Sequence, residues 1–118
     1  MYTSFVKEVG SLALAFEEDK VVILFGPEAP QELRDVSIIH EVNQEDNDAP
    51  IKNGGELQID DQIYKVTAVG TSANKNLKEL GHISIYFSEP NEEILPGAVF
   101  VSPSKYPKLD KNSKIVFK

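Results

Sequence analysis

The sequence contains no cysteine and no tryptophan, and it is short of basic residues. Without cysteine, the chain cannot form a disulfide, a thiolate zinc site or an iron–sulfur cluster, and no thiol can act as a nucleophile. Twelve Lys and Arg stand against nineteen Asp and Glu, which gives a net charge of −7. Because phosphate backbones are held by clustered Lys and Arg, this balance argues against nucleic acid as a partner. It favours a positively charged partner, although the same charge would also simply keep the protein soluble.

Long hydrophobic runs are also missing. None approaches the length of about 20 residues that a membrane-spanning helix needs. Residues 1–8 lack the basic region and apolar core of a signal peptide. The 118 residues, 41% of them hydrophobic, have the length of one domain and enough apolar content for a core. We therefore expect residues 1–118 to form a single cytoplasmic domain whose only link to a membrane is a partner.

The sequence does contain a strong period of two. Residues 2–9 alternate, residues 20–25 are a β-branched run closed by Gly26-Pro27, and Asp60-Asp61 separates two strand-like runs. The other runs lie at 36–42, 56–59, 62–69, 82–87, 98–101 and 114–117. This pattern predicts an all-β fold, a small closed or partly open barrel of about eight short strands. Short helical turns are expected only at 74–80, ended by Gly81, and at 30–34. An unpaired first strand at 2–9 could also pair across a homodimer.

Residues 43–50 combine acidic side chains, amides and a proline, and are expected to form a solvated loop. The acidic run lacks the glycine and final glutamate of a calcium-binding EF-hand loop, so we expect no metal there. Because residues 44–48 follow the strand expected at 36–42, they could influence which partner docks nearby.

The two histidines, His40 and His82, are the side chains best suited to neutral-pH nucleophilic or proton-transfer chemistry. An imidazole titrates near pH 6.5, so at neutral pH one ring nitrogen carries an available lone pair. The alternative for each is a histidine that serves only the structure. The sequence has no Gly-x-x-x-x-Gly-Lys phosphate loop, no Gly-x-Ser-x-Gly and no His-x-x-x-His, which disfavours nucleotide-binding and hydrolytic functions.

Several segments resemble a known family. The segments are residues 66–70, Ala73, Asn76-Leu77 and 79–82, then Ile39-His40, residues 26–30 with Leu33, and residues 95–99. Together they resemble the glucitol/sorbitol-specific IIA component of the bacterial phosphotransferase system. The resemblance covers nearly the whole chain in order. It implies an all-β phosphocarrier that takes a phosphoryl group from HPr onto His40. The group then passes to the IIB domain of a permease, which phosphorylates glucitol as it enters the cell. No cofactor or metal is implied, because the donor is another protein's phosphohistidine.

If His40 carries a phosphoryl group, other residues are expected to support it. His82 would donate a hydrogen bond to the phosphoryl group; alternatively, it is a strand-start histidine bonded to a carbonyl. Neutral donors for the phosphoryl group are expected in the block before His82, where each could equally be a cap or turn residue: Thr67, Gly70, Thr71, Ser72, Asn74 and Asn76. Glu41 should point away from His40. Apolar residues near His40 would either border a docking site or pack in the core: Ile38, Ile39 and Leu80.

The main alternative is a non-catalytic β-barrel binding or regulatory module of the same fold. The state of His40 distinguishes the two. A carrier is expected to have a partly exposed imidazole with an open ring nitrogen, whereas a structural histidine would be buried with both nitrogens bonded.

Overall fold

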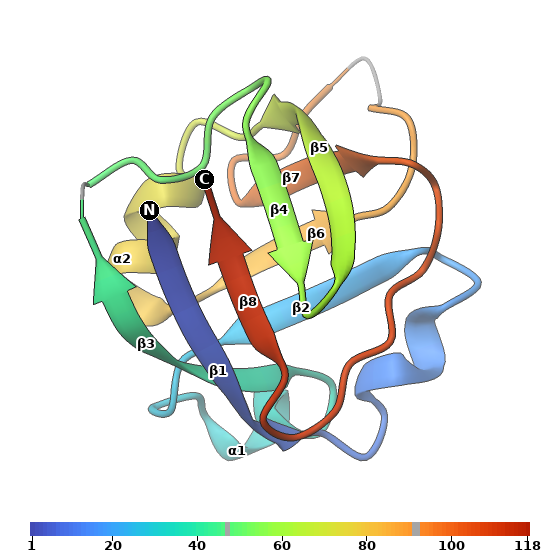
Figure 1. Ribbon diagram of the computed structural model, residues 1–118. Helices are drawn as coiled ribbons and strands as arrows, with labels where there is room; N and C mark the ends of the chain where they lie inside the picture. The colour runs from blue at the N-terminus through green and yellow to red at the C-terminus, as the bar shows by residue number, and fades with distance from the viewer. Residues whose placement is uncertain (47, 91–92) are drawn as a thin grey trace.

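The protein is a closed β-barrel of eight strands (Figure 1). The computed structural model describes residues 1–46, 48–90 and 93–118. The strands are β1 (Tyr2–Val9), β2 (Val21–Phe25), β3 (Ile38–Glu45), β4 (Glu56–Ile59), β5 (Gln62–Val69), β6 (Ile83–Tyr86), β7 (Ala98–Ser102) and β8 (Lys114–Phe117). They follow one another around the barrel in the order β1-β3-β2-β6-β7-β5-β4-β8. The predicted all-β barrel is confirmed, and it is closed rather than partly open.

Closure depends on pairings between distant parts of the chain. β1 is antiparallel to β3 on one side and to β8 on the other, while β2–β3 and β6–β7 are parallel pairs. The expectation that β1 offers a free edge for a homodimer is therefore wrong, because β8 occupies that edge. The core is formed by the inward-facing apolar residues of all eight strands, such as Val6, Leu24, Leu57, Val66, Ile85, Val101 and Phe117.

The third strand is longer at its end than the sequence indicates. Residues 43–45, expected in a loop, belong to β3, and Tyr2 and Thr3 of β1 pair with Glu45 and Gln44. The side chains of residues 43–45 are exposed. Backbone hydrogen bonds to β1 therefore hold these residues in the strand without a buried face. Residue 47, in the same stretch, lies outside the described residues.

Three short helices connect the strands within the described residues. α1 (Gln31–Arg34) and α2 (Ala73–Leu80) lie where helical turns were expected, whereas η1 (Ala13–Phe16), a 3₁₀ helix, was not predicted. Gly81 ends α2 in the left-handed conformation, at φ 66°. In Figure 1, α2 lies beside the first residues of β1 and the last residues of β3. None of the helices in the described ranges combines the length and apolar character of a membrane span.

Candidate active site

The imidazole of His40 is buried in β3 and hydrogen-bonded at both ring nitrogens. Its side chain is only 1% exposed. Nδ1 lies 2.7 Å from the hydroxyl of Ser4, and Nε2 lies 2.7 Å from the carbonyl oxygen of Gly81. The three residues belong to β1, β3 and the end of α2, so the site joins two strands to the C-terminus of a helix.

The strand register explains the contact with Ser4. In the antiparallel pair, His40 is opposite Val6, and Ser4 is opposite Val42. Ser4 and His40 are therefore diagonal neighbours, and both are buried on the inner face of the barrel. A small hydroxyl at this diagonal position leaves room for the ring and gives it a polar partner.

Gly81 reaches His40 because two glycines lie against each other. Gly26, directly after β2, donates its backbone N–H to the Leu80 carbonyl at 2.9 Å. A Cβ atom on Gly81 would lie 2.8 Å from the Cα and backbone nitrogen of Gly26, and 3.4 Å from Nε2 of His40. Only glycine combines the left-handed conformation with this close approach. The end of α2 therefore covers the ring at Nε2.

The hydrogen bonds determine the resting tautomer of His40. A carbonyl oxygen only accepts, so Nε2 carries the proton and donates it to Gly81; Nδ1 then accepts from the Ser4 hydroxyl. Burial lowers the pKa of His40, and the bond to the Gly81 carbonyl acts in the opposite direction. The imidazole is thus held neutral, the form in which one ring nitrogen keeps a lone pair.

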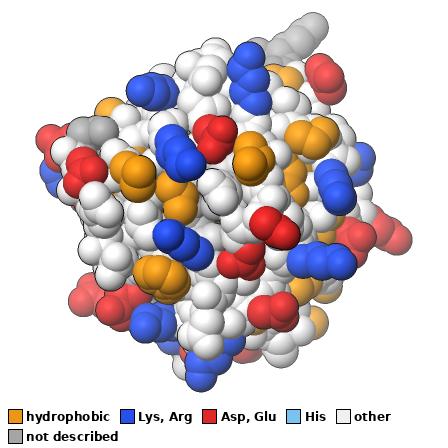
Figure 2. Space-filling model, viewed as in Figure 1, with side chains coloured by type: hydrophobic (Ala, Val, Ile, Leu, Met, Phe, Trp, Pro, Cys, Tyr) orange, Lys and Arg blue, Asp and Glu red, His pale blue; other side chains and the backbone are white. Residues whose placement is uncertain are grey.

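Beside His40 lies a cleft of about 550 Å³. Its lining includes His40, Gly81 and apolar side chains from β2, β3 and α2, among them Phe25, Val42 and Leu80. The charged residues in the lining are Glu28, Glu45, Glu79 and Lys78, so Lys78 is the one Lys or Arg among the described lining residues. By contrast, basic and acidic side chains are interspersed over the face seen in Figure 2. The cleft is therefore both apolar and acidic.

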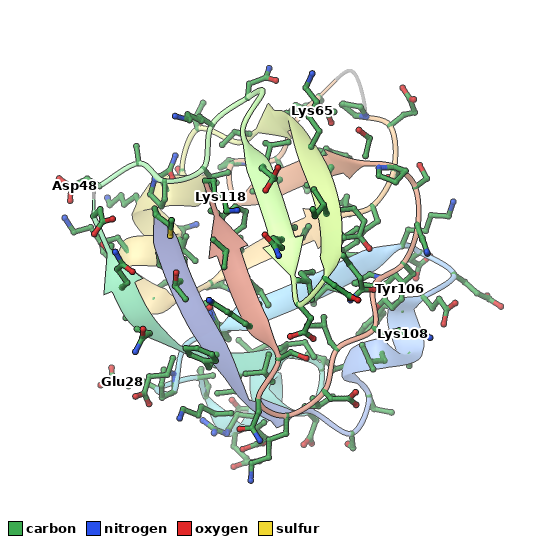
Figure 3. The ribbon with its side chains drawn as sticks, in the orientation of Figure 1. Glu28, Asp48, Lys65, Tyr106, Lys108 and Lys118 are labelled. Carbon is green, nitrogen blue, oxygen red and sulfur yellow. The ribbon has the colours of Figure 1, made fainter. Side chains whose placement is uncertain are left out.

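Lys78 is held at the cleft by an ion pair with Asp48, the residue labelled beyond the end of β3 in Figure 3. Both side chains are well exposed, Lys78 at 50% and Asp48 at 83%. The pKa of Lys78 is raised by its hydrogen bond to Asp48 and by the charge of that carboxylate. Because exposed ion pairs are weak, Lys78 can exchange this partner for another anion.

His82 lies directly before β6 and contacts Phe25, a residue of the cleft lining. Its Nδ1 donates to the Leu24 carbonyl at 3.1 Å, and its ring stacks on Phe25 with 4.3 Å between the ring centroids. In the described part of the chain, the cleft lining does not include His82. This geometry matches the alternative expectation, a strand-start histidine bonded to a nearby carbonyl.

The neutral donors predicted near His82 are not brought to His40. Thr67 donates to the Phe100 carbonyl, the backbone N–H groups of Gly70 and Ser72 bond to Ala98 and Pro96, and the side-chain amide of Asn74 bonds to the backbone of Ile51. Thr71 is exposed, and Asn76 accepts the backbone N–H of His82. None of these residues is in the described lining of the cleft. Thr67 lies in β5, and residues 70–72 lie before the N-terminus of α2. The eight residues of α2 span about 12 Å, and His40 contacts the C-terminal end of that helix.

Comparison with known proteins decides the family. The family model described as "PTS system glucitol/sorbitol-specific IIA component" matches residues 1–116. The chain belongs to this family. It is therefore a phosphotransferase component with the role of a phosphocarrier. The resemblance stated from the sequence is confirmed.

Individual relatives agree with this assignment of the IIA component. The chain is 31% identical over 102 residues to the glucitol/sorbitol-specific EIIA component of Escherichia coli (strain K12), covering 86% of this chain and 81% of that protein. The Shigella flexneri protein of the same name gives the same identity and coverage. A solved structure, the PTS system IIA component from Enterococcus faecalis V583, superposes with a TM-score of 0.86 at 26% identity and covers 98% of each chain.

The sequence reasoning missed two residues near His40 and its cleft, Ser4 and Lys78. Ser4 faces inward in a strand that alternation had predicted, so a hydroxyl on the buried face was a usable signal. Lys78 lies three residues before Gly81, on the last turn of α2. Of the apolar residues considered for docking, Ile38 and Ile39 are buried, whereas Leu80 is 52% exposed at the cleft. Glu41 is exposed, away from the buried ring of His40, as expected.

Proposed function

We propose that His40 accepts the phosphoryl group from phospho-HPr and passes it to the IIB domain of a glucitol/sorbitol permease. In this proposal residues 1–118 act as a single cytoplasmic domain that needs no cofactor and meets the membrane only through the permease. The observation that carries the proposal is the placement of the histidines. His40 lines a cleft at the surface, whereas the described lining of that cleft does not include His82.

Nε2 of His40 is the nitrogen that we propose forms the bond to phosphorus. Nδ1 faces Ser4 inside the barrel, whereas Nε2 faces Gly81, a residue of the cleft lining. In the resting site Nε2 carries a proton and is covered by the Gly81 carbonyl. Transfer therefore requires the end of α2 to move off the ring and the proton to leave Nε2. A neutral imidazole can then attack without a general base, because phosphoryl transfer depends mainly on positioning and charge stabilisation.

The charge of the incoming group is matched by Lys78. A phosphoryl group brings negative charge next to Glu28, Glu45 and Glu79, and Lys78 is the one cation in the described lining. Exchange of the exposed Asp48 carboxylate for phosphoryl oxygens would place the ammonium where charge builds up. This role replaces the one first expected for the neutral donors before His82.

The surroundings of the cleft suit a basic, partly apolar partner surface. Exposed Leu80 and Val42 supply apolar contact, and Glu28, Glu45 and Glu79 supply negative charge. Complementary charge speeds encounter, while a small interface allows rapid release to the next partner. The same cleft can serve donor and acceptor in turn, because only one of them can reach His40 at a time.

The test is phosphorylation with purified components. The protein is incubated with the general phosphotransferase enzyme, HPr and phosphoenolpyruvate, and then weighed by mass spectrometry. We expect an acid-labile, base-stable gain of about 80 Da on the wild type and on His82→Ala, and no gain on His40→Ala. Circular dichroism of each variant checks that it is folded. Addition of a IIB domain should then remove the label.

One observation favours a second candidate, a binding or regulatory module that is never phosphorylated. His40 is buried with both ring nitrogens bonded, the arrangement expected of a structural histidine. If folded wild-type protein gains no mass while HPr in the same mixture is phosphorylated, this second function replaces the first.

A further inference from the structure

We propose that Ser4 is a positioning residue for phosphoryl transfer, because its hydroxyl can bond Nδ1 of His40 in both tautomers. The inference rests on the proposed role of His40. It adds a residue that does not touch the phosphoryl group but controls which ring nitrogen is free to do so.

The two partners of the ring are held very differently. Ser4 is fully buried in the middle of the sheet, paired with Val42 of β3 on one side and Ile115 of β8 on the other. Gly81 lies at the end of a short helix and borders the cleft. When the ring is uncovered, the contact at Gly81 can be lost while the contact at Ser4 stays. Ser4 therefore remains the fixed point that orients the imidazole.

The chemistry requires that fixed point to be a hydroxyl. At rest, Nδ1 accepts the Ser4 O–H; for attack, Nε2 must carry the lone pair, so the proton must lie on Nδ1 and Ser4 Oγ must accept it. A hydroxyl both donates and accepts, so rotation of one O–H bond serves both states. A carbonyl could serve only the second state. An alanine would leave Nδ1 without a partner in either state, at a cost in the buried interior.

The phenol of Tyr2 gives the Ser4 hydroxyl a second hydrogen-bond acceptor. Burial and the charge of Glu45 raise the pKa of Tyr2 to about 12, while a hydrogen bond with Ser4 acts in the opposite direction. Tyr2 is therefore a neutral phenol next to Ser4. Its oxygen can accept the Ser4 O–H when Ser4 turns to accept from Nδ1.

Once the ring is uncovered, Nε2 releases its proton to water in the cleft, and Nδ1 gains a proton through the hydroxyls of Ser4 and Tyr2, the latter a residue of the cleft lining. The transfer step then balances. The Nε2 lone pair forms the new P–N bond, and the P–N bond of the donor phosphohistidine breaks with its electron pair going to the donor's ring nitrogen. The proton stays on Nδ1 and is hydrogen-bonded to Ser4 Oγ. The phosphorylated ring therefore carries a positive charge beside the negative phosphoryl group. Transfer to the acceptor reverses these changes.

The test compares Ser4→Ala with Ser4→Thr in the phosphorylation assay, as initial rates of mass gain. We expect Ser4→Ala to be labelled at His40 about tenfold more slowly, which corresponds to the loss of one buried hydrogen bond. Ser4→Thr keeps the hydroxyl and should recover most of the rate. Ser37→Ala is the matched control, since Ser37 is equally buried but donates to the Leu33 carbonyl; it should behave as wild type.

A second readout does not depend on phosphorylation. The ¹⁵N resonance of His40 Nδ1 should shift toward that of a free imidazole nitrogen in Ser4→Ala and stay in place in Ser37→Ala. Ser4→Cys, similar in size but a weak hydrogen-bond partner, takes the place of Ser4→Ala if the latter folds poorly. If wild-type His40 is labelled but Ser4→Ala matches its rate and its Nδ1 resonance, the Ser4 proposal alone is overturned. If the wild type is labelled elsewhere, the proposed function falls and this inference falls with it.

Discussion

Burial of His40 makes the stability of the protein depend on pH in a defined direction. Burial lowers the pKa of this group in the folded state, whereas the unfolded chain should have the ordinary value near 6.5. As pH falls, the unfolded state therefore binds a proton before the folded state does. The contribution of neutral His40 to stability is fully present above pH 6.5 and is lost as pH falls below it.

The size of the loss follows from one proton. A group that is neutral when folded and titrates at pH 6.5 when unfolded costs about 1.4 kcal/mol between pH 7.5 and pH 5.5, which is the upper limit for a single histidine. Replacement of His40 by Gln removes the titrating ring, while its side-chain amide can still donate to the Gly81 carbonyl. The variant should therefore be less stable at pH 7.5 but should lose less stability between the two pH values.

The assay is urea unfolding followed by circular dichroism at pH 7.5, 6.5 and 5.5. Ser37→Ala, which leaves both imidazoles in place and removes a buried hydrogen bond elsewhere, is the control, and we expect it to keep the pH dependence of the wild type. If His40→Gln loses as much stability as the wild type between pH 7.5 and 5.5, then His40 is not held neutral by burial, and the argument for its resting state is refuted.

Two further predictions concern the walls of the cleft. Lys78→Met should slow phosphorylation of His40, by less than the roughly hundred- to thousandfold of a buried charge-stabilising donor because Lys78 is half exposed, with little change in urea stability. Lys78→Arg should retain most of the rate. Lys75→Met, which changes a lysine on the same helix but outside the described lining, should retain all of it. Equal rates for Lys78→Met and Lys75→Met would contradict the role of Lys78. Gly81→Ala should destabilise the fold by more than the roughly 1–2 kcal/mol of a left-handed residue, because its Cβ would meet backbone at 2.8 Å. Gly54→Ala, also at positive φ but with nothing within 4 Å of the new Cβ, should cost only the backbone part; equal losses in urea unfolding would show that the close approach at Gly81 is not rigid.

Much of the fold could be predicted from local pattern, because each strand shows its own alternation. Barrel closure could not, since it depends on pairs such as β1 with β8, which join the two ends of the chain. The end of β3 was missed for a related reason: residues 43–45 are polar, and only their pairing with β1 makes them a strand.

The site divides in the same way. His40 could be found because few residue types carry out this chemistry and neighbouring residues resemble the family. Ser4 lies 36 positions away in sequence, and only the strand register brings its hydroxyl to the ring. The residues expected to donate to the phosphoryl group do not line the cleft beside His40, because nearness in sequence to His82 is not nearness in space to His40. They lie in β5, before α2 or, for Asn74 and Asn76, within it, whereas His40 is hydrogen-bonded to Gly81, the residue that ends α2.

The closed resting site is compatible with a carrier when the energies are compared. Uncovering Nε2 breaks the hydrogen bond from His40 to the Gly81 carbonyl. If the end of α2 moves as a unit, the hydrogen bond from Gly26 to the Leu80 carbonyl breaks as well. Each such bond contributes a net of about 1 kcal/mol, so opening costs only a few kcal/mol. Even a weak, micromolar complex releases about 8 kcal/mol, and a partner that binds the open form better can therefore uncover the ring. Between encounters the end of α2 covers the imidazole again and excludes water from Nε2. Burial of His40 is thus compatible with a carrier that opens only for its partners.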